Sequence, residues 1–154
     1  MPDPPMQDRK IGSVVIRLRA RARSKYQVFV FYEDQAIVVV PLRSARRIFP
    51  WVWLFGFGVL VRAGIVDRQR VEESAPLQRL DREALLAFPG AYTMSLSRMA
   101  AVELARKWYW MNRTDIRFLR EGGDIVWGSI LGISRDDLAP ILERSLGAQF
   151  IDLT

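Results

Sequence analysis

The residues of this 154-residue chain that are best suited to chemistry are arginines at alternate positions near its start. Four of them form what we call the arginine stripe: Arg17, Arg19, Arg21 and Arg23. Because successive side chains point to opposite faces of a strand, an extended segment would place all four guanidinium groups on one face. A guanidinium group binds phosphate and carboxylate oxygens through paired hydrogen bonds. The spacing therefore predicts an anion-binding or partner-binding face, with contributions from three nearby cations, Lys25, Arg46 and Arg47.

The arginine stripe also has two purely structural interpretations. Charged side chains commonly face solvent along a sheet edge, where they discourage pairing with another chain. Alternatively, the guanidinium groups form ion pairs with neighbouring strands of the same protein. The acidic candidates for such pairs are Glu33, Asp34, Glu103 and Asp115. The sequence leaves these alternatives open.

A run rich in aromatic residues, Ile48 to Phe57, follows the arginine stripe. Four rings alternate along it and would share one face of an extended segment: Trp51, Trp53, Phe55 and Phe57. Such a face packs on the sheet, joins two copies of the chain, or inserts at a membrane interface, where tryptophan is enriched. The apolar stretch that contains the run spans residues 48–61 and is shorter than the ~18 to 20 residues of a membrane-spanning helix, so we expect no transmembrane segment.

Composition argues against the commonest catalytic and metal-binding chemistry. The chain contains no cysteine and no histidine, which removes thiol nucleophiles, imidazole-dependent triads and the usual zinc ligand sets. The adjacent carboxylates at 72–73 and 136–137 lie in segments expected to be exposed, and the glycines at 56 and 58 lack the rest of a phosphate-binding loop. We therefore predict a non-enzymatic protein with no catalytic residues, no metal and no cofactor.

The net charge of +6 is concentrated in the first half of the chain. Residues 1–70 contain 13 basic and 5 acidic residues, whereas residues 71–154 contain 10 basic and 12 acidic residues. This asymmetry indicates an anionic partner, such as phospholipid headgroups, nucleic acid or an acidic protein surface. The aromatic triplet Trp108-Tyr109-Trp110, flanked by Lys107 and Arg113, is suited to base stacking and keeps nucleic acid open as an alternative.

Apolar patterning and turn residues predict a mainly β protein. We expect three strands, an insertion over residues 43–90, and then four further strands. The predicted strands are residues 11–23, 26–32, 36–42, 91–96, 100–110, 114–120 and 125–131. Inside the insertion we predict a polar connector at 67–74 and a short helix at 81–88 with Asp81 as its N-cap. An amphipathic helix is predicted at 137–146, with Asp137 as its N-cap and Gly147 at its end.

The element order and several short motifs resemble a known family. The motifs are residues 88–99 (FPGAYTMSLSRM), Val102-Glu103-Leu104, residues 114–118 (TDIRF) and the helix from Leu138 to Gly147. In these features the chain is similar to small uncharacterised bacterial proteins with a pleckstrin-homology-like (PH-like) domain. The resemblance implies an α+β, mainly β fold, with an antiparallel seven-strand sandwich closed by a C-terminal capping helix. It also implies basic residues where the first two strands meet, here Arg21, Arg23 and Lys25.

Together these features predict one domain with a binding function. We expect a disordered tail over residues 1–10 and a single PH-like domain over 11–154. The predicted function is that of a non-enzymatic adaptor that docks on an anionic membrane surface or on a protein partner, with homo-oligomer formation expected. A nucleic-acid-binding module and a structural homo-oligomerisation domain are the alternatives. The expected location is the cytoplasm, with peripheral attachment at the inner membrane face.

Overall fold

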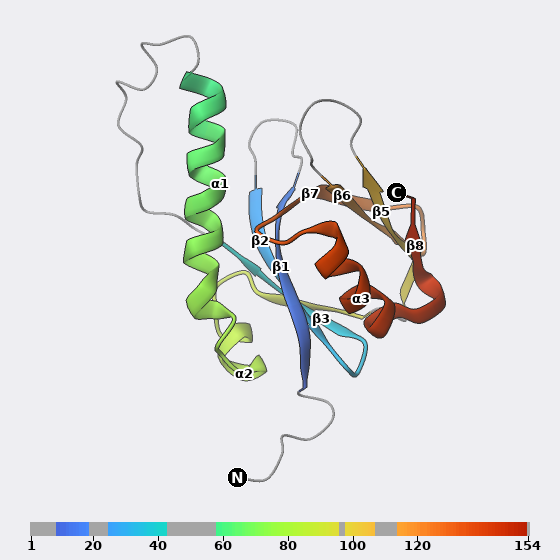
Figure 1. The fold of residues 1–154 in the computed structure, drawn as a ribbon. Helices are drawn as coiled ribbons and strands as arrows, with labels where there is room; N and C mark the ends of the chain where they lie inside the picture. The colour runs from blue at the N-terminus through green and yellow to red at the C-terminus, as the bar shows by residue number, and fades with distance from the viewer. Residues whose placement is uncertain (1–8, 19–24, 43–57, 96–97, 107–113, 154) are drawn as a thin grey trace.

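The protein is built on one eight-stranded sheet, as Figure 1 shows for a computed structural model. The structure describes residues 9–18, 25–42, 58–95, 98–106 and 114–153. The strands lie in the order β4-β3-β2-β1-β7-β6-β5-β8. Their bounds are Lys10–Leu18 (β1), Lys25–Tyr32 (β2), Ala36–Pro41 (β3), Tyr92–Ser95 (β4), Met99–Arg106 (β5), Thr114–Arg120 (β6), Ile125–Leu131 (β7) and Phe150–Asp152 (β8).

Three α-helices accompany the sheet in the described part of the chain. Their bounds are Gly58–Leu77 (α1), Arg82–Leu86 (α2) and Arg135–Leu146 (α3), and a short 3-10 helix, Gly147–Gln149 (η4), leads from α3 into β8. In Figure 1, α3 lies across the sheet, while α1 and α2 lie beside β1 and β2. The mainly β architecture with a C-terminal helix is therefore confirmed, with one strand more than predicted.

The two halves of the sheet are joined by β1. This strand pairs antiparallel with β2 along its length and, near its end, antiparallel with β7. Pairing of β2 with β3, β3 with β4, β5 with β6, and β6 with β7 is also antiparallel. Only β8, the unpredicted strand, runs parallel to its neighbour, β5. The antiparallel arrangement of the first three strands is therefore confirmed.

The central strands are buried on both faces. Along β2, Phe29 and Phe31 belong to one apolar core, whereas the alternating residues Val28 and Val30 belong to another. The first core packs under α3 and contains a stacked ring pair, Phe29 and Phe118, with centroids 5.1 Å apart. The second core lies on the opposite side of β2 and includes residues of α1 and α2. This double burial explains why β2 and β3 read as nearly continuous apolar runs.

The strand predictions are largely confirmed within the described residues. Strands β6 and β7 have the predicted bounds, and β2 and β3 differ from prediction by one residue each. The tight turn between β6 and β7 contains Gly122 and Gly123, both with positive φ, as the sequence predicts. Strand β1 is described from Lys10, inside the expected tail, to Leu18, and residues 19–23 of the predicted strand lie outside the described residues.

The prediction of a polar connector at residues 67–74 is wrong. These residues belong to α1, a helix of 20 residues. The helix starts with an apolar half, residues 58–66, that has a single charged residue, Arg62, and continues with a polar half. The apolar residues are concentrated in the first half of the helix and do not recur every three or four residues. The segment therefore lacks the periodic pattern that identifies an amphipathic helix.

The predicted N-cap of the C-terminal helix is also wrong. The helix begins two residues earlier, at Arg135, and its N-cap is Ser134, whose side chain accepts a hydrogen bond from the backbone N–H of Asp137. Pro140 consequently lies in the second helical turn. Its missing N–H leaves unpaired only the carbonyl of Asp136, a residue with an exposed side chain that water can reach. The helix at 82–86, in contrast, has the predicted cap, Asp81.

The position of this cap leads to a stability prediction. We expect Ser134→Ala to lower the free energy of unfolding by about 1 kcal/mol, because the first turn of α3 loses its side-chain acceptor. Asp137→Ala should cost less, about 0.5 kcal/mol, since this carboxylate accepts only an exposed hydrogen bond from the Ser134 hydroxyl and interacts with the helix dipole. Urea denaturation of both variants measures the difference. A larger loss of stability for Asp137→Ala would contradict Ser134 as the N-cap and would favour Asp137, the N-cap predicted from the sequence.

Candidate functional site

Arg17, the first residue of the arginine stripe, is engaged inside the protein. Its guanidinium group forms an ion pair with Asp67 of α1, with an N–O distance of 2.9 Å, and the two side chains are only 16% and 13% exposed. The hydroxyl of Tyr26, on β2, donates a hydrogen bond of 2.8 Å to the same carboxylate. The partner of Arg17 is thus none of the four acidic residues that the sequence suggested. Arg17 positions α1 against the sheet.

The environment of Tyr26 changes its acid–base behaviour. Burial, together with the hydrogen bond to Asp67, raises the pKa of the Tyr26 hydroxyl from about 10 to about 12. The guanidinium of Arg70 also lies over the Tyr26 ring, 5.0 Å from its centroid. The hydroxyl is therefore a structural donor at physiological pH.

This shift predicts a loss of stability at alkaline pH. Between pH 10 and 12 the unfolded chain releases the tyrosine proton while the folded protein retains it, so unfolding becomes easier as pH rises. We expect the free energy of unfolding to fall across this window, and to fall less in Tyr26→Phe. Chemical denaturation at pH 9, 10, 11 and 12 measures both slopes. Equal slopes in the two proteins would contradict the assignment.

The other predicted site residues have side chains outside the described part of the structure. They are Arg19, Arg21, Arg23, Lys25, Arg46, Arg47, Trp51, Trp53, Phe55 and Phe57. The backbone of Lys25 is described as the first residue of β2. The structure does describe the strand and helix ends that flank the two segments containing the other residues, 19–24 and 43–57.

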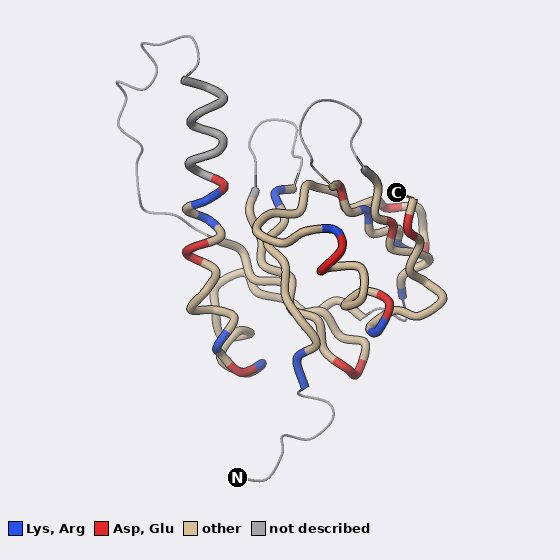
Figure 2. The backbone as a smooth tube through the Cα atoms, viewed as in Figure 1, with Lys and Arg blue, Asp and Glu red and all other residues tan. Residues whose placement is uncertain are grey.

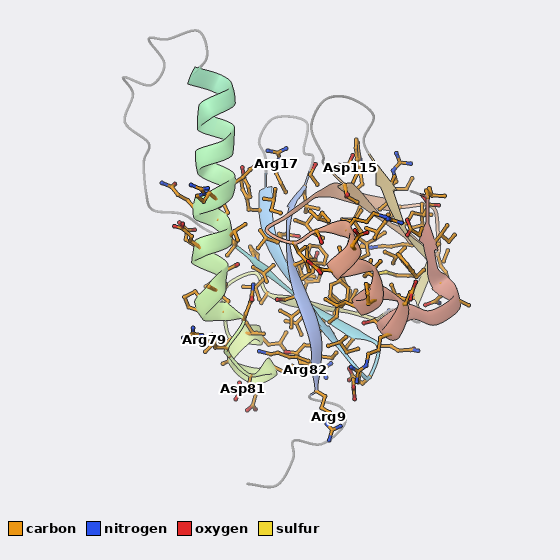
Figure 3. The ribbon with its side chains drawn as sticks, viewed as in Figure 1. Arg9, Arg17, Arg79, Asp81, Arg82 and Asp115 are labelled. Atoms are coloured by element: carbon orange, nitrogen blue, oxygen red, sulfur yellow. The ribbon has the colours of Figure 1, made fainter. Side chains whose placement is uncertain are left out.

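A row of paired residues crosses five strands at one end of the sheet. Tyr26 lies opposite Arg17, Arg17 opposite Ser129, Ser129 opposite Asp115, and Asp115 opposite Ala105. The hydroxyl of Ser129 donates a 2.8 Å hydrogen bond to the carboxylate of the buried Asp115. Figure 3 shows Arg17 and Asp115 at this end of the molecule. We call it the Arg17 end.

Three chain segments leave the described structure at the Arg17 end. The segment 19–24 connects Leu18 to Lys25, which pair with each other next to Arg17 and Tyr26. The segment 43–57 begins after Leu42, whose N–H donates to the carbonyl of Tyr26 over 2.9 Å. The segment 107–113 connects Arg106 to Thr114, which pair beside Asp115. The register therefore brings the attachment points of these segments to one end.

Helix α1 also begins at the Arg17 end. The Lys10 amine, at the start of β1, donates to the carbonyls of Gln78 and Leu80, just beyond the end of α1. Because Asp67 pairs with Arg17 near the end of β1, the helix runs antiparallel to that strand. Gly58 precedes Asp67 by nine residues, or about 13 Å along a helix axis. The start of α1 therefore extends past Arg17, as Figure 3 shows.

The opposite end of the molecule carries an open hollow of about 1020 Å³. Five basic side chains line it: Arg9, Lys10, Arg79, Arg82 and Arg144. Figure 3 shows Arg9, Arg79 and Arg82 near Asp81 at this end, and Figure 2 shows the mixed charges on the backbone there. Burial lowers the pKa of the Lys10 amine, while the nearby Asp81 carboxylate opposes this effect. The sequence does not predict this site, because its residues come from four distant segments.

The described residues provide no obvious metal centre and no membrane-spanning helix. Within those ranges, no three acidic, histidine or cysteine side chains are close enough together to hold a metal ion. No helix in that part of the chain is both long and apolar enough to cross a membrane. No family model, no curated protein and no solved structure matches this chain.

Proposed function

We propose that the protein is a non-enzymatic, PH-like binding module that docks on an anionic membrane surface through its Arg17 end. The observation that supports this proposal most strongly is the register of the sheet. It places the attachment points of three basic and aromatic segments at the end where α1 also starts. Segments that are distant in sequence can then act on one surface.

The composition of these segments fits an anionic interface. Segments 19–24, 43–57 and 107–113 together contain eight basic residues, eight aromatic residues and no acidic residue. Each basic residue near an anionic leaflet contributes about 1 kcal/mol, and tryptophan and tyrosine prefer the headgroup region. The first nine residues of α1 continue the apolar character. A membrane interface offers anionic headgroups to the cations and an apolar region to the aromatic residues.

The ion pair of Arg17 refines the proposed binding surface. Because Asp67 neutralises Arg17 inside the protein, we assign Arg17 to orienting α1 and not to contact with lipid. The proposed lipid-facing cations are Arg19, Arg21, Arg23, Lys25, Arg46 and Arg47, together with the rings of Trp51, Trp53, Phe55 and Phe57. The strand order and the C-terminal helix support the PH-like assignment, which implies a basic surface where the first two strands meet.

Vesicle co-sedimentation tests this proposal. At low salt, we expect the protein to sediment with vesicles that contain phosphatidylglycerol and to remain in solution with pure phosphatidylcholine. The triple variant Arg19→Glu, Arg21→Glu and Arg23→Glu should partition at least about 100-fold more weakly, because three charges of about 1 kcal/mol each are lost. Added salt should weaken binding of the wild-type protein.

A second triple variant controls for net charge. Arg98→Glu, Arg117→Glu and Arg120→Glu changes the charge equally, but none of these residues lies in the row that defines the Arg17 end. We expect this variant to sediment almost as well as the wild type. Equal recovery of the wild-type protein with neutral and anionic vesicles would contradict the proposal, as would equal losses in the two triple variants. Single-stranded oligonucleotides that bind more tightly than vesicles would favour the nucleic-acid alternative instead.

A further inference from the structure

The basic side chains that line the hollow at the end opposite Arg17 have more N–H donors than the carboxylates around the hollow accept from. Glu33 accepts from Arg144, and Asp34, next to the hollow, accepts from Arg82 over 2.8 Å. Asp81 serves as the N-cap of α2, accepting from the N–H of Ala84 over 2.8 Å. Of the carboxylates around the hollow, three are therefore already engaged in the structure of the protein.

Two of the guanidinium groups retain available donors. Arg79 is exposed, and within the described residues its side chain forms no ion pair or hydrogen bond. Arg144 uses one of its terminal nitrogens for Glu33, and its side chain is 66% exposed. A guanidinium group has five N–H donors in a planar fork, so both residues can bind a further anion. They come from different elements, the α1–α2 link and α3, and line the same hollow.

The surroundings of these two residues favour a multiply charged ligand. Arg9, Lys10 and Arg82 add positive charge along the same walls, so the cations of the lining outnumber its carboxylates, Glu33, Asp81 and Glu83. The volume of about 1020 Å³ accommodates a ligand of nucleotide size. A single carboxylate would neutralise one of these cations, whereas a chain of phosphate groups carries enough charge to interact with several of them.

We propose that this hollow binds a molecule that carries two or more linked phosphate groups, with Arg79 and Arg144 as its principal contacts. The site is separate from the Arg17 end and does not depend on membrane docking. Phosphate groups could be presented by a soluble metabolite or by a lipid headgroup. The hollow lies at the end away from the proposed membrane contact, so we assign it a soluble ligand.

Calorimetric titration with inorganic tripolyphosphate tests this proposal. We expect one tripolyphosphate per chain, with binding weakened about ten-fold in Arg79→Ala and in Arg144→Ala, since each substitution removes a charge-assisted hydrogen bond. The matched control is Arg98→Ala, which removes an exposed arginine from outside the hollow and should change binding less than two-fold. Circular dichroism establishes that each variant is folded before the titration.

Several results would overturn the proposal. They are the absence of binding to the folded wild-type protein at millimolar tripolyphosphate, an equal loss in Arg98→Ala, and tighter binding of a glutamate-rich peptide than of tripolyphosphate. Binding to phosphate-bearing vesicles that requires Arg79 and Arg144, without binding of tripolyphosphate, would assign the hollow to lipid and refute the soluble ligand. Loss of vesicle binding in the stripe variant with tripolyphosphate binding intact would leave this inference standing, because the two sites are at opposite ends.

Discussion

Asp67→Ala should lower the free energy of unfolding by about 3 kcal/mol, because it leaves the largely buried Arg17 guanidinium without its carboxylate. The Tyr26 hydroxyl loses its acceptor in the same substitution. Both effects act where α1 is attached to β1 and β2, so the helix should also become less protected. Denaturant unfolding measures the stability, and amide exchange over residues 67–77 measures the attachment of the helix.

The matched control for this substitution is Glu72→Ala. Glu72 is an exposed acidic residue on the same helix, and its loss should change stability by less than about 0.5 kcal/mol. If both variants lose the same stability, the effect comes from removing an acidic residue from α1. In that case the ion pair with Arg17 would not hold the helix to the sheet.

Gly128→Ala should have a comparable effect at the junction of the two halves of the sheet. Gly128 of β7 lies opposite Leu18 of β1, and an added Cβ would lie 2.4 Å from the carbonyl oxygen of Arg17. Since backbone atoms cannot move aside as a side-chain tip can, the β1–β7 pairing would have to shift. We expect a loss of about 3 kcal/mol, at the upper end of the overpacking range.

Gly12→Ala provides the comparison for this prediction. Its added Cβ would meet the Cδ1 atom of Ile141 at 2.6 Å, which is the far end of a flexible side chain. Rotation of that side chain relieves most of the overlap, so we expect a loss of about 1 kcal/mol. A smaller loss at Gly128 than at Gly12 in thermal unfolding would contradict the close approach of β7 to β1.

The sequence was most informative where burial produces a clear pattern. Strands β2, β3, β6 and β7 are rich in β-branched and aromatic residues, and turn residues such as Gly122 and Gly123 mark their limits. Strand β8 was missed because three residues carry almost no pattern, and its position depends on parallel pairing with β5. Helix α1 was missed because tertiary contacts such as the Arg17–Asp67 pair, rather than an amphipathic stripe, hold it in place.

The candidate sites were predictable to different extents. The concentration of positive charge and aromatic residues in the sequence identifies the segments of the proposed membrane surface, but only strand register shows that their attachment points share one end. Internal pairing of the arginine stripe was one of the predicted alternatives, but the partner of Arg17 could not be predicted, because Asp67 is 50 residues away in the chain. The hollow around Arg79 and Arg144 likewise requires the folded arrangement of β1, α2 and α3.

The position of the tryptophan residues gives the most direct test of membrane docking. Four of the five tryptophans lie in segments that begin at the Arg17 end, and the fifth, Trp127, lies in β7. Brominated lipids quench the emission only of tryptophans that enter the bilayer. We predict strong quenching by brominated vesicles that contain phosphatidylglycerol, weaker quenching in the Trp51→Phe and Trp53→Phe double variant, and none with neutral brominated vesicles. Unchanged emission with an excess of anionic brominated vesicles at low salt would contradict docking through this end.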